Sequence, residues 1–253
     1  MASIPLSVSA LASVKKSLRK DYWNIRSSHL SEALAAALGR RTYAALLADI
    51  RQQGSDPIFE TLDDERFEAR LQELGYPPEG DFSFELLSET PEGMISTMHD
   101  SLEDIEYRTA RDKAWRNLMV AATNEGIRQR LFSVRAGDNR WPGSEPINGG
   151  RSKDGWLFDF KLPNGLPARG WVDDIGCSEL SIHVAVNPKG SRVVASNAGF
   201  SAGDAFATGW LEREKGAWLQ STLDLRCRKA LLQTLADMYV CPLGFGDRGR
   251  VIT

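Results

Sequence analysis

The second half of the chain changes to a two-residue period, and this pattern constrains the fold more than any other feature of the sequence. Apolar and polar residues alternate in four segments, at 156–162, 168–175, 179–186 and 191–197. Strong turn sequences follow two of them, Pro163-Asn164-Gly165 after the first and Asn187-Pro188-Lys189-Gly190 after the third. Because half-buried strands alternate in this way and such turns join antiparallel neighbours, we predict a sheet of four antiparallel strands.

A long amphipathic helix is expected to follow these strands, over 217–240. The apolar positions expected on its sheet-facing side are Trp218, Leu219, Leu231, Leu235 and Met238. A sheet covered by one helix is an α+β arrangement, so we predict an α+β domain over 155–253. The polar segment 137–154, rich in Gly, Pro and Asn, is the expected linker loop before that domain.

The first part of the chain has the residue spacing of helices instead. A short basic helix is expected over 12–22, and a clearer one over 27–39. Ser27 or Ser28 is expected to cap the second helix by accepting a hydrogen bond from its first turn. Gly39 supplies the left-handed residue that ends such a helix.

A third helix is expected to begin after its cap residue, Thr42, and to end at Gly54. These helices together predict a basic helical hairpin module over 1–55. The next region, 56–136, is acidic and is predicted to be mostly helical. Its first helix is expected over 56–76, and its second from Pro91 or Ser96 through the 120s.

The formal net charge of −3 hides a strong asymmetry along the chain. Residues 1–55 carry a net charge of +5, and residues 56–112 carry −13. Residues 113–155 return to +4, and residues 156–253 are nearly balanced at +1. A basic head and an acidic middle indicate at least two functional surfaces, unless the two segments pack together and neutralise each other.

The acidic middle is the expected contact surface for a basic partner protein or nucleoprotein complex. The candidate protein-binding residues are Asp63, Asp64, Glu65, Glu68, Asp100, Glu103, Asp104 and Glu106. A related hypothesis is that this array imitates the phosphates of nucleic acid and occupies the groove of a nucleic-acid-binding protein. The alternative to both is an acidic face that only keeps the protein in solution.

The basic residues of the head, with two arginines near the C-terminus, are candidates for binding nucleic-acid phosphate. They are Lys15, Lys16, Arg19, Lys20, Arg40, Arg41, Arg248 and Arg250. The second and third helices also have the order of a helix-turn-helix. Sequence-specific reading of DNA is disfavoured, because Leu46, Leu47 and Ile50 stand where polar side chains would meet base edges.

The sequence SSHLSEALAAALGRRTYAALLADI, within residues 12–52, resembles a small helical module of proteobacterial plasmid and mobile-element proteins. The module also occurs in chains labelled as glyoxalase-related. A glyoxalase-type site needs a set of His and Glu ligands, and the three histidines of this chain do not provide one. The resemblance therefore implies no catalytic residues. It implies a mobile-element protein, some of which inhibit host defence.

Recognisable catalytic chemistry is sparse in the sequence. The three cysteines form neither a disulfide framework nor a zinc motif, which indicates a reducing, cytoplasmic location. There is no apolar run long enough to span a membrane and no typical signal peptide. We predict no metal and no cofactor. An enzyme remains an alternative, and it predicts a polar pocket around His183, Asp204 or Glu212.

We therefore expect a non-enzymatic accessory protein of a bacterial mobile element, which docks on a protein or nucleoprotein complex through its acidic surface. The alternative expectation is a nucleic-acid-binding accessory protein that uses the basic N-terminal helices. Steep weakening of binding by salt would distinguish the second hypothesis from the first.

Overall fold

A computed structural model describes residues 1–77, 82–97, 102–103, 105–140, 155–190, 193 and 198–251. The chain divides into two compact units, Met1–Met98 and His99–Thr253, and each contains helices and strands. The division does not fall at the expected linker 137–154, and it splits the expected acidic region 56–136 between the units. None of the helices in the described residues is long and apolar enough to cross a membrane.

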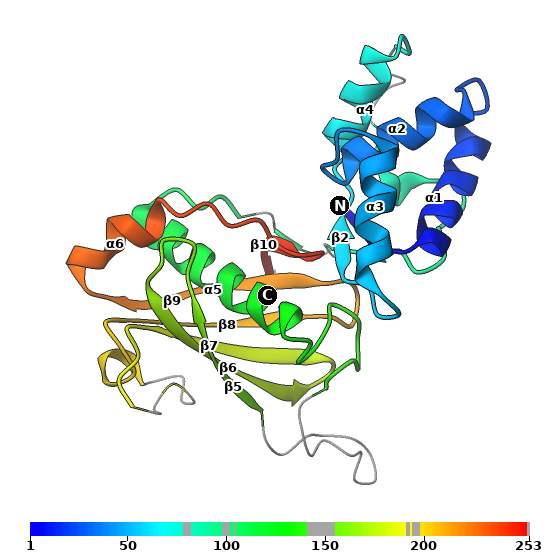
Figure 1. Cartoon of the computed structure of the whole chain (residues 1–253). Coiled ribbons are helices and arrows are strands. Elements are labelled where there is room, and N and C mark those ends of the chain that lie inside the picture. The colour runs from blue at the N-terminus through cyan, green and yellow to red at the C-terminus, as the bar shows by residue number, and fades with distance from the viewer. Residues whose placement is uncertain are drawn as a thin grey trace, which may run out of the picture. The chain divides into compact units, whose positions relative to one another are not determined.

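The first unit combines four helices with a small sheet (Figure 1). The helices are α1 (Val8–Asp21), α2 (Ser27–Ala37), α3 (Tyr43–Gln53) and α4 (Asp64–Glu73), with a short 3-10 helix, η1 (Phe84–Leu86). The strands, in sheet order, are β2 (Phe59–Thr61), β1 (Ala2–Pro5) and β3 (Ile95–Ser96). A continuous apolar core joins these elements, and Ile4, Leu30 and Phe67 are fully buried in it.

The three helices predicted in the basic head are confirmed. The Thr42 hydroxyl caps α3 by accepting a hydrogen bond from the amide of Ala45 at 3.2 Å. Gly39 has the expected positive φ, of 74°, after α2. The predicted cap of α2 is wrong, because Arg26 stands at that position and makes no side-chain capping bond. Ser27 already lies inside the helix.

The helix predicted over 56–76 is partly wrong. Phe59–Thr61 form β2, which pairs antiparallel with β1, and the helix begins only at Asp64. The cause is a long-range interaction, since β1 supplies backbone partners that a local pattern cannot reveal. The helix predicted to start at Pro91 or Ser96 begins at Ala110 instead, because Ile95–Ser96 pair with β1 as β3.

The described residues of the second unit form a seven-stranded sheet, the helices α5 (Ala110–Arg128) and α6 (Lys229–Ala236) and a short 3-10 helix, η3 (Gly199–Ser201). In sheet order the strands are β4 (Leu102–Glu103), β10 (Gly246–Val251), β9 (Trp218–Cys227), β8 (Ala205–Glu212), β7 (Glu179–Val186), β6 (Pro167–Gly176) and β5 (Trp156–Lys161). All pairs are antiparallel except β9 and β10. Figure 1 shows α5 lying across one face of the sheet.

The structure confirms a mixed α and β architecture but corrects the predicted four-stranded sheet. The segments 156–162, 168–175 and 179–186 form strands as predicted, whereas 191–197 lies outside the described residues apart from Val193. The long helix predicted over 217–240 is largely wrong, because Trp218–Cys227 form β9 and only Lys229–Ala236 are helical, as α6.

The helix that covers the sheet is α5, from the expected acidic region, and not the C-terminal helix. Trp115 on α5 is fully buried, and its indole nitrogen donates to the carbonyl of Thr208 at 2.8 Å. Gly209, the next residue on β8, gives this ring room: an added Cβ there would lie 3.0 Å from Trp115. The sheet face toward α5 is accordingly apolar, with Ile182 and Val184 fully buried.

Candidate binding surfaces on the first unit

Helix α4 lies between the two candidate surfaces of the first unit, because residues on its opposite flanks line two different concavities. Phe67, Glu68 and Leu71 line one of them, and Arg66 and Arg70 line the other. Residues three or four apart share a face of a helix, so this division follows from the sequence of α4. We call the first concavity the aromatic pocket and the second the arginine groove.

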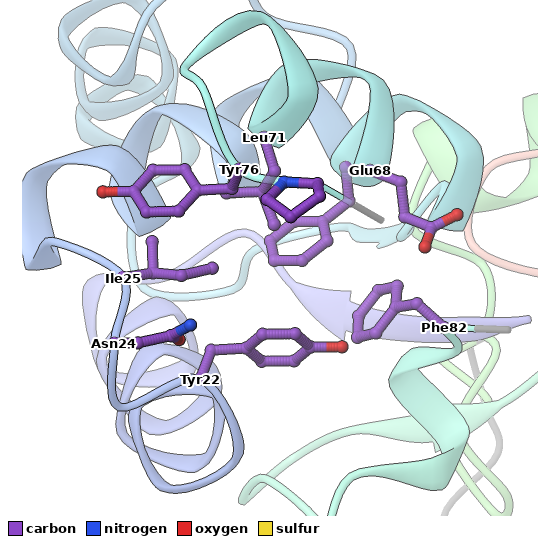
Figure 2. Close-up of a pocket in the computed structure, with 9 residues that line it drawn as sticks. Tyr22, Asn24, Ile25, Glu68, Leu71, Tyr76 and Phe82 are labelled. Atoms are coloured by element: carbon purple, nitrogen blue, oxygen red, sulfur yellow. The ribbon is translucent and has the colours of Figure 1, made fainter. Parts of the chain in front are cut away.

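The aromatic pocket is a small cavity of about 70 Å³ (Figure 2). Its lining residues are Tyr22, Asn24, Ile25, Phe67, Glu68, Leu71, Tyr76, Pro77 and Phe82. They come from the end of α1, the turn before α2, the buried side of α4, and the chain that follows α4. The pocket is therefore assembled from segments that are distant in the sequence and meet in the core of this unit.

Aromatic rings hold the walls of the pocket in place. Phe67 and Phe82 stack with their ring centroids 4.7 Å apart, and Tyr22 meets Phe82 edge to face at 5.7 Å. The hydroxyl of Tyr76 points away from the cavity in Figure 2, accepts a bond from the amide of Arg26 at 3.2 Å, and lies 3.0 Å from Nδ1 of His29. These contacts make the pocket a preformed feature of the unit.

Two side chains near this pocket, an exposed tryptophan and a half-buried carboxylate without an ion pair among the described residues, are unusual for a surface that has no ligand. Trp23 stands between two pocket residues, Tyr22 and Asn24, and its side chain is 84% exposed. Glu68 is half-buried, and it forms no ion pair with any residue that the structure describes. Glu68 is also the one charged residue among the lining residues. The lining of the pocket is therefore mainly aromatic and contains one negatively charged side chain.

The structure separates the predicted protein-binding residues. Asp63 and Asp64 have structural roles: Asp63 caps α4 by accepting from the amide of Arg66 at 3.0 Å, and Asp64 accepts from the amide of Phe84 at 3.2 Å. Burial raises the pKa of Asp64, and the bond from Phe84 opposes this shift. Glu65 is exposed on the same helix, one residue after Asp64.

The other predicted acidic residues do not belong to the surface of α4. Glu106 lies in the second unit and forms an ion pair with Arg108 at 2.9 Å. Asp100 and Asp104 lie outside the described residues, and of Glu103 only the backbone is described, in β4. Of the predicted protein-binding residues, Asp63, Asp64, Glu65 and Glu68 therefore lie in the first unit, on the N-cap and the first half of α4.

Several of the predicted basic residues are engaged within the first unit. Lys15 donates to the Ser31 hydroxyl at 2.6 Å, and burial lowers its pKa. Lys20 forms an ion pair with Glu89, and Arg40 one with Asp49 and another with Glu60. The basic head and part of the acidic middle therefore pack together and pair their charges, as one of the alternatives from the sequence predicts.

Three other basic residues of the head, Lys16, Arg19 and Arg41, are exposed and form no ion pair with the described residues. The side chains of Arg248 and Arg250 are not described. Their backbone forms β10, which pairs with β9 and β4. This Gly/Arg-rich segment is therefore a strand within the sheet.

The arginine groove unites Arg40 and Arg41 with two arginines that the sequence reasoning missed. It is a shallow concavity of about 680 Å³ between the α2–α3 turn and α4, where Arg66 and Arg70 join the other two. Arg66 and Arg70 are four residues apart, so the sequence predicts that they share a face of α4. The carboxylates that surround them in the sequence obscured this pair of positive charges. Arg66 pairs with Asp63 at 3.2 Å, so part of the positive charge in the groove is compensated.

The residues proposed for an enzyme site do not meet in the second unit. His183 is 7% exposed on β7, opposite Thr208 of β8. Asp204 and Glu212 each stand four residues from Thr208 along the chain, which is about 13 Å in a strand. Asp204 instead bonds Lys189 at 2.6 Å. The structure therefore places these three alternatives at separate positions of the second unit.

His183 occupies a buried polar position on the sheet face opposite to α5. Its Nε2 lies 3.1 Å from the hydroxyl of Ser181, and its ring stacks on Phe206 with centroids 6.2 Å apart. Its Nδ1 has no hydrogen-bond partner among the described residues. Burial lowers the pKa of His183 to about 4, and the charge of Asp224 only partly opposes this.

A buried arginine, which the sequence reasoning also missed, holds the loops at one end of the second unit. Arg213 is 2% exposed and donates to the carbonyl oxygens of Ser178 and Ser133, each at 3.0 Å, and to Oδ1 of Asn139 at 2.9 Å. Burial lowers its pKa to about 10. Its guanidinium acts as an internal cross-link between the β6–β7 turn and the loop after α5.

Comparison of the chain with protein-family models, with curated proteins and with solved structures gives no match.

Proposed function

We propose that this chain is a non-enzymatic accessory protein that docks on a partner protein or nucleoprotein complex with a basic surface. The contact surface consists of Trp23, the aromatic pocket and two carboxylates of α4, the exposed Glu65 and the half-buried Glu68. The place of the protein in a bacterial mobile element rests on the resemblance of residues 12–52. Its cytoplasmic location rests on the cysteine usage.

The charge of the first unit supports a basic partner. Residues 1–98 contain ten Lys and Arg against fifteen Asp and Glu, a net charge of −5. Arg40 and Lys20, from the basic head, are already paired with carboxylates of the same unit. The remaining excess is negative, and such a field attracts a basic surface and repels an acidic one.

The observation that carries the proposal is the exposure of Trp23 beside a preformed aromatic pocket. An 84% exposed tryptophan leaves a large apolar area in water, where it contributes little to the stability of the fold. Tryptophan is enriched among the residues that dominate binding energy at protein interfaces, and such residues pair with pockets. Trp23 does not itself line the pocket, but it stands between the lining residues Tyr22 and Asn24 in the chain, so a partner that covers the pocket passes close to it.

The experiment is affinity capture with the tagged whole chain, from a nuclease-treated extract of the organism that encodes it, at low ionic strength. We expect Trp23→Ala to abolish retention of the specific partner, and Glu65→Gln combined with Glu68→Gln to weaken it. The matched control is Tyr239→Ala in the second unit, because Tyr239 is also 84% exposed. Capture of the same proteins by wild type and Trp23→Ala would refute the proposal.

A second candidate function is binding of nucleic-acid phosphates in the arginine groove. Its support is the convergence of Arg41, Arg66 and Arg70 on one concavity next to the first turn of α3. Arginine forks bind phosphate well, and the partial positive charge at a helix N-terminus adds to this. The ion pairs of Arg66 with Asp63 and of Arg70 with Glu73 compensate part of this charge and make this candidate the weaker of the two.

Salt dependence tests the second candidate directly. Binding to a random-sequence oligonucleotide should weaken steeply with added salt, and Arg41→Glu should lower both the affinity and the steepness. Trp23→Ala should leave this binding unchanged. Oligonucleotide binding that is absent, or equal in wild type and Arg41→Glu, would eliminate this candidate without affecting the first.

A further inference from the structure

We propose that the aromatic pocket receives the ammonium end of a lysine side chain of the partner. This inference rests on the proposed function, because it names the chemistry of the group that the docking surface recognises. The occupant is defined by three properties of the pocket, which are its size, the nature of its walls and its charge.

The size limits the occupant to the tip of a side chain. A cavity of about 150 Å³ accommodates a benzene ring, and one water occupies about 30 Å³ of the liquid. The pocket, at about 70 Å³, therefore has room for a few non-hydrogen atoms. The Nζ of lysine with one or two methylene groups fits this space. The planar guanidinium of arginine needs more width in one plane.

The walls suit a cation attached to an apolar stem. The faces of aromatic rings carry negative electrostatic potential and attract an ammonium group within about 6 Å of the ring centre. Tyr22 and Phe82, both half-buried, provide two rings with centroids 5.7 Å apart, and the fully buried ring of Phe67 stacks on Phe82. Ile25 and Leu71 add aliphatic surface, against which the methylene groups of lysine can pack.

The charge of the pocket calls for a positive ligand. Glu68 lines it, and Figure 2 shows the carboxylate at the end of the pocket where Phe82 lies. Arg66 and Arg70 line the arginine groove on the other flank of α4, and neither lines this pocket. An uncharged side chain would fill the same volume but would leave Glu68 without a counter-ion.

The test uses three small probes with the whole protein: the N-acetyl, N-methylamide derivatives of lysine, norleucine and arginine. Norleucine has the lysine stem without the ammonium group, so it measures the apolar contribution alone. Binding is followed by the amide resonances of Tyr22, Phe67 and Phe82 in two-dimensional NMR spectra. We expect the lysine probe to bind about tenfold more tightly than either of the others.

Variants assign the effect to the pocket. Glu68→Gln keeps the shape of the side chain and should remove most of the preference for lysine over norleucine. Phe82→Leu keeps an apolar wall without the ring and should also reduce the preference. Glu92→Gln removes an exposed carboxylate of the same unit that does not line the pocket, and it should leave the preference close to that of the wild type.

The outcomes separate this inference from the proposed function. Equal binding of lysine and norleucine, or no binding of the lysine probe to the wild type, overturns the lysine assignment even if Trp23→Ala abolishes capture of the partner. Preferential lysine binding that Glu68→Gln removes supports the assignment. It does so even if the capture experiment shows that the partner docks elsewhere, because the probes need no partner.

Discussion

Mild acid should destabilise the second unit through His183, by an amount that its burial allows to be calculated. The pKa of His183 is about 4 in the folded protein and about 6.5 in an unfolded chain. As the pH falls below 6.5, the unfolded state takes up a proton that the folded state does not bind. The contribution of the neutral imidazole is therefore complete above pH 6.5 and is lost progressively as the pH falls through 4.

The expected loss between pH 7 and pH 5 is about 2 kcal/mol, and it approaches about 3 kcal/mol below pH 4. The assay is urea unfolding at these pH values, followed by tryptophan fluorescence. This signal reports mainly on the second unit, which contains all the tryptophans except Trp23. His183→Gln removes the titrating ring, so its loss of stability between pH 7 and pH 5 should be about 2 kcal/mol smaller than that of the wild type.

Ser181→Ala is the matched control, because it removes the neighbouring hydroxyl and keeps the buried imidazole. It should lower stability at both pH values and retain the pH dependence of the wild type. If wild type and His183→Gln lose the same stability between pH 7 and pH 5, His183 is not held neutral by burial, and the reasoning is refuted.

Two further predictions concern stability and are tested by urea unfolding. Arg213→Lys should destabilise the second unit by about 3 kcal/mol. The reason is that an ammonium group cannot bond all the acceptors that the guanidinium group bonds at the same time. A loss of stability below about 1 kcal/mol would contradict the cross-linking role. Thr42→Ala should cost the first unit about 1 kcal/mol through loss of the α3 cap, whereas Ser27→Ala should cost much less, since Ser27 caps no helix. Equal losses in these two variants would show that the cap of α3 contributes little.

The N-terminal helices could be predicted because their signals are local. The cap at Thr42, the left-handed Gly39 and the spacing of apolar residues all lie within or next to the helices that they define. The small sheet could not be predicted in the same way, because β1 and β2 have four and three residues. Strands of that length depend on partners far along the chain, and these partners leave no pattern in a short window.

The error at 217–240 has a related cause. The ten residues from Trp218 to Cys227 contain apolar residues at spacings that fit either a helix or a strand. Pairing of β9 with β8 on one edge and β10 on the other decides the outcome. An apolar run without turn signals is ambiguous in this way, and only the sheet around it resolves the ambiguity.

The candidate site was predictable only in its charges. Glu68 was identified from the acidic composition of its segment, but the aromatic pocket beside it requires the ends of α1 and α4 to meet. The ion pairs of Lys20 and Arg40 were equally invisible, since their partners are 69 and 20 residues away. The charged segments can therefore be predicted from the sequence, whereas the ion pairs that neutralise part of their charge cannot.

The most direct test of the docking proposal is site-specific photocrosslinking. A benzophenone side chain placed at position 26, which is exposed and three residues after Trp23, leaves Trp23 and the pocket residues in place, and a second protein carries it at position 239 in the second unit. We expect one crosslinked partner from position 26 that excess unlabelled wild-type chain competes away, and none from position 239. Crosslinking of the same protein from both positions, or only from position 239, would contradict the docking proposal.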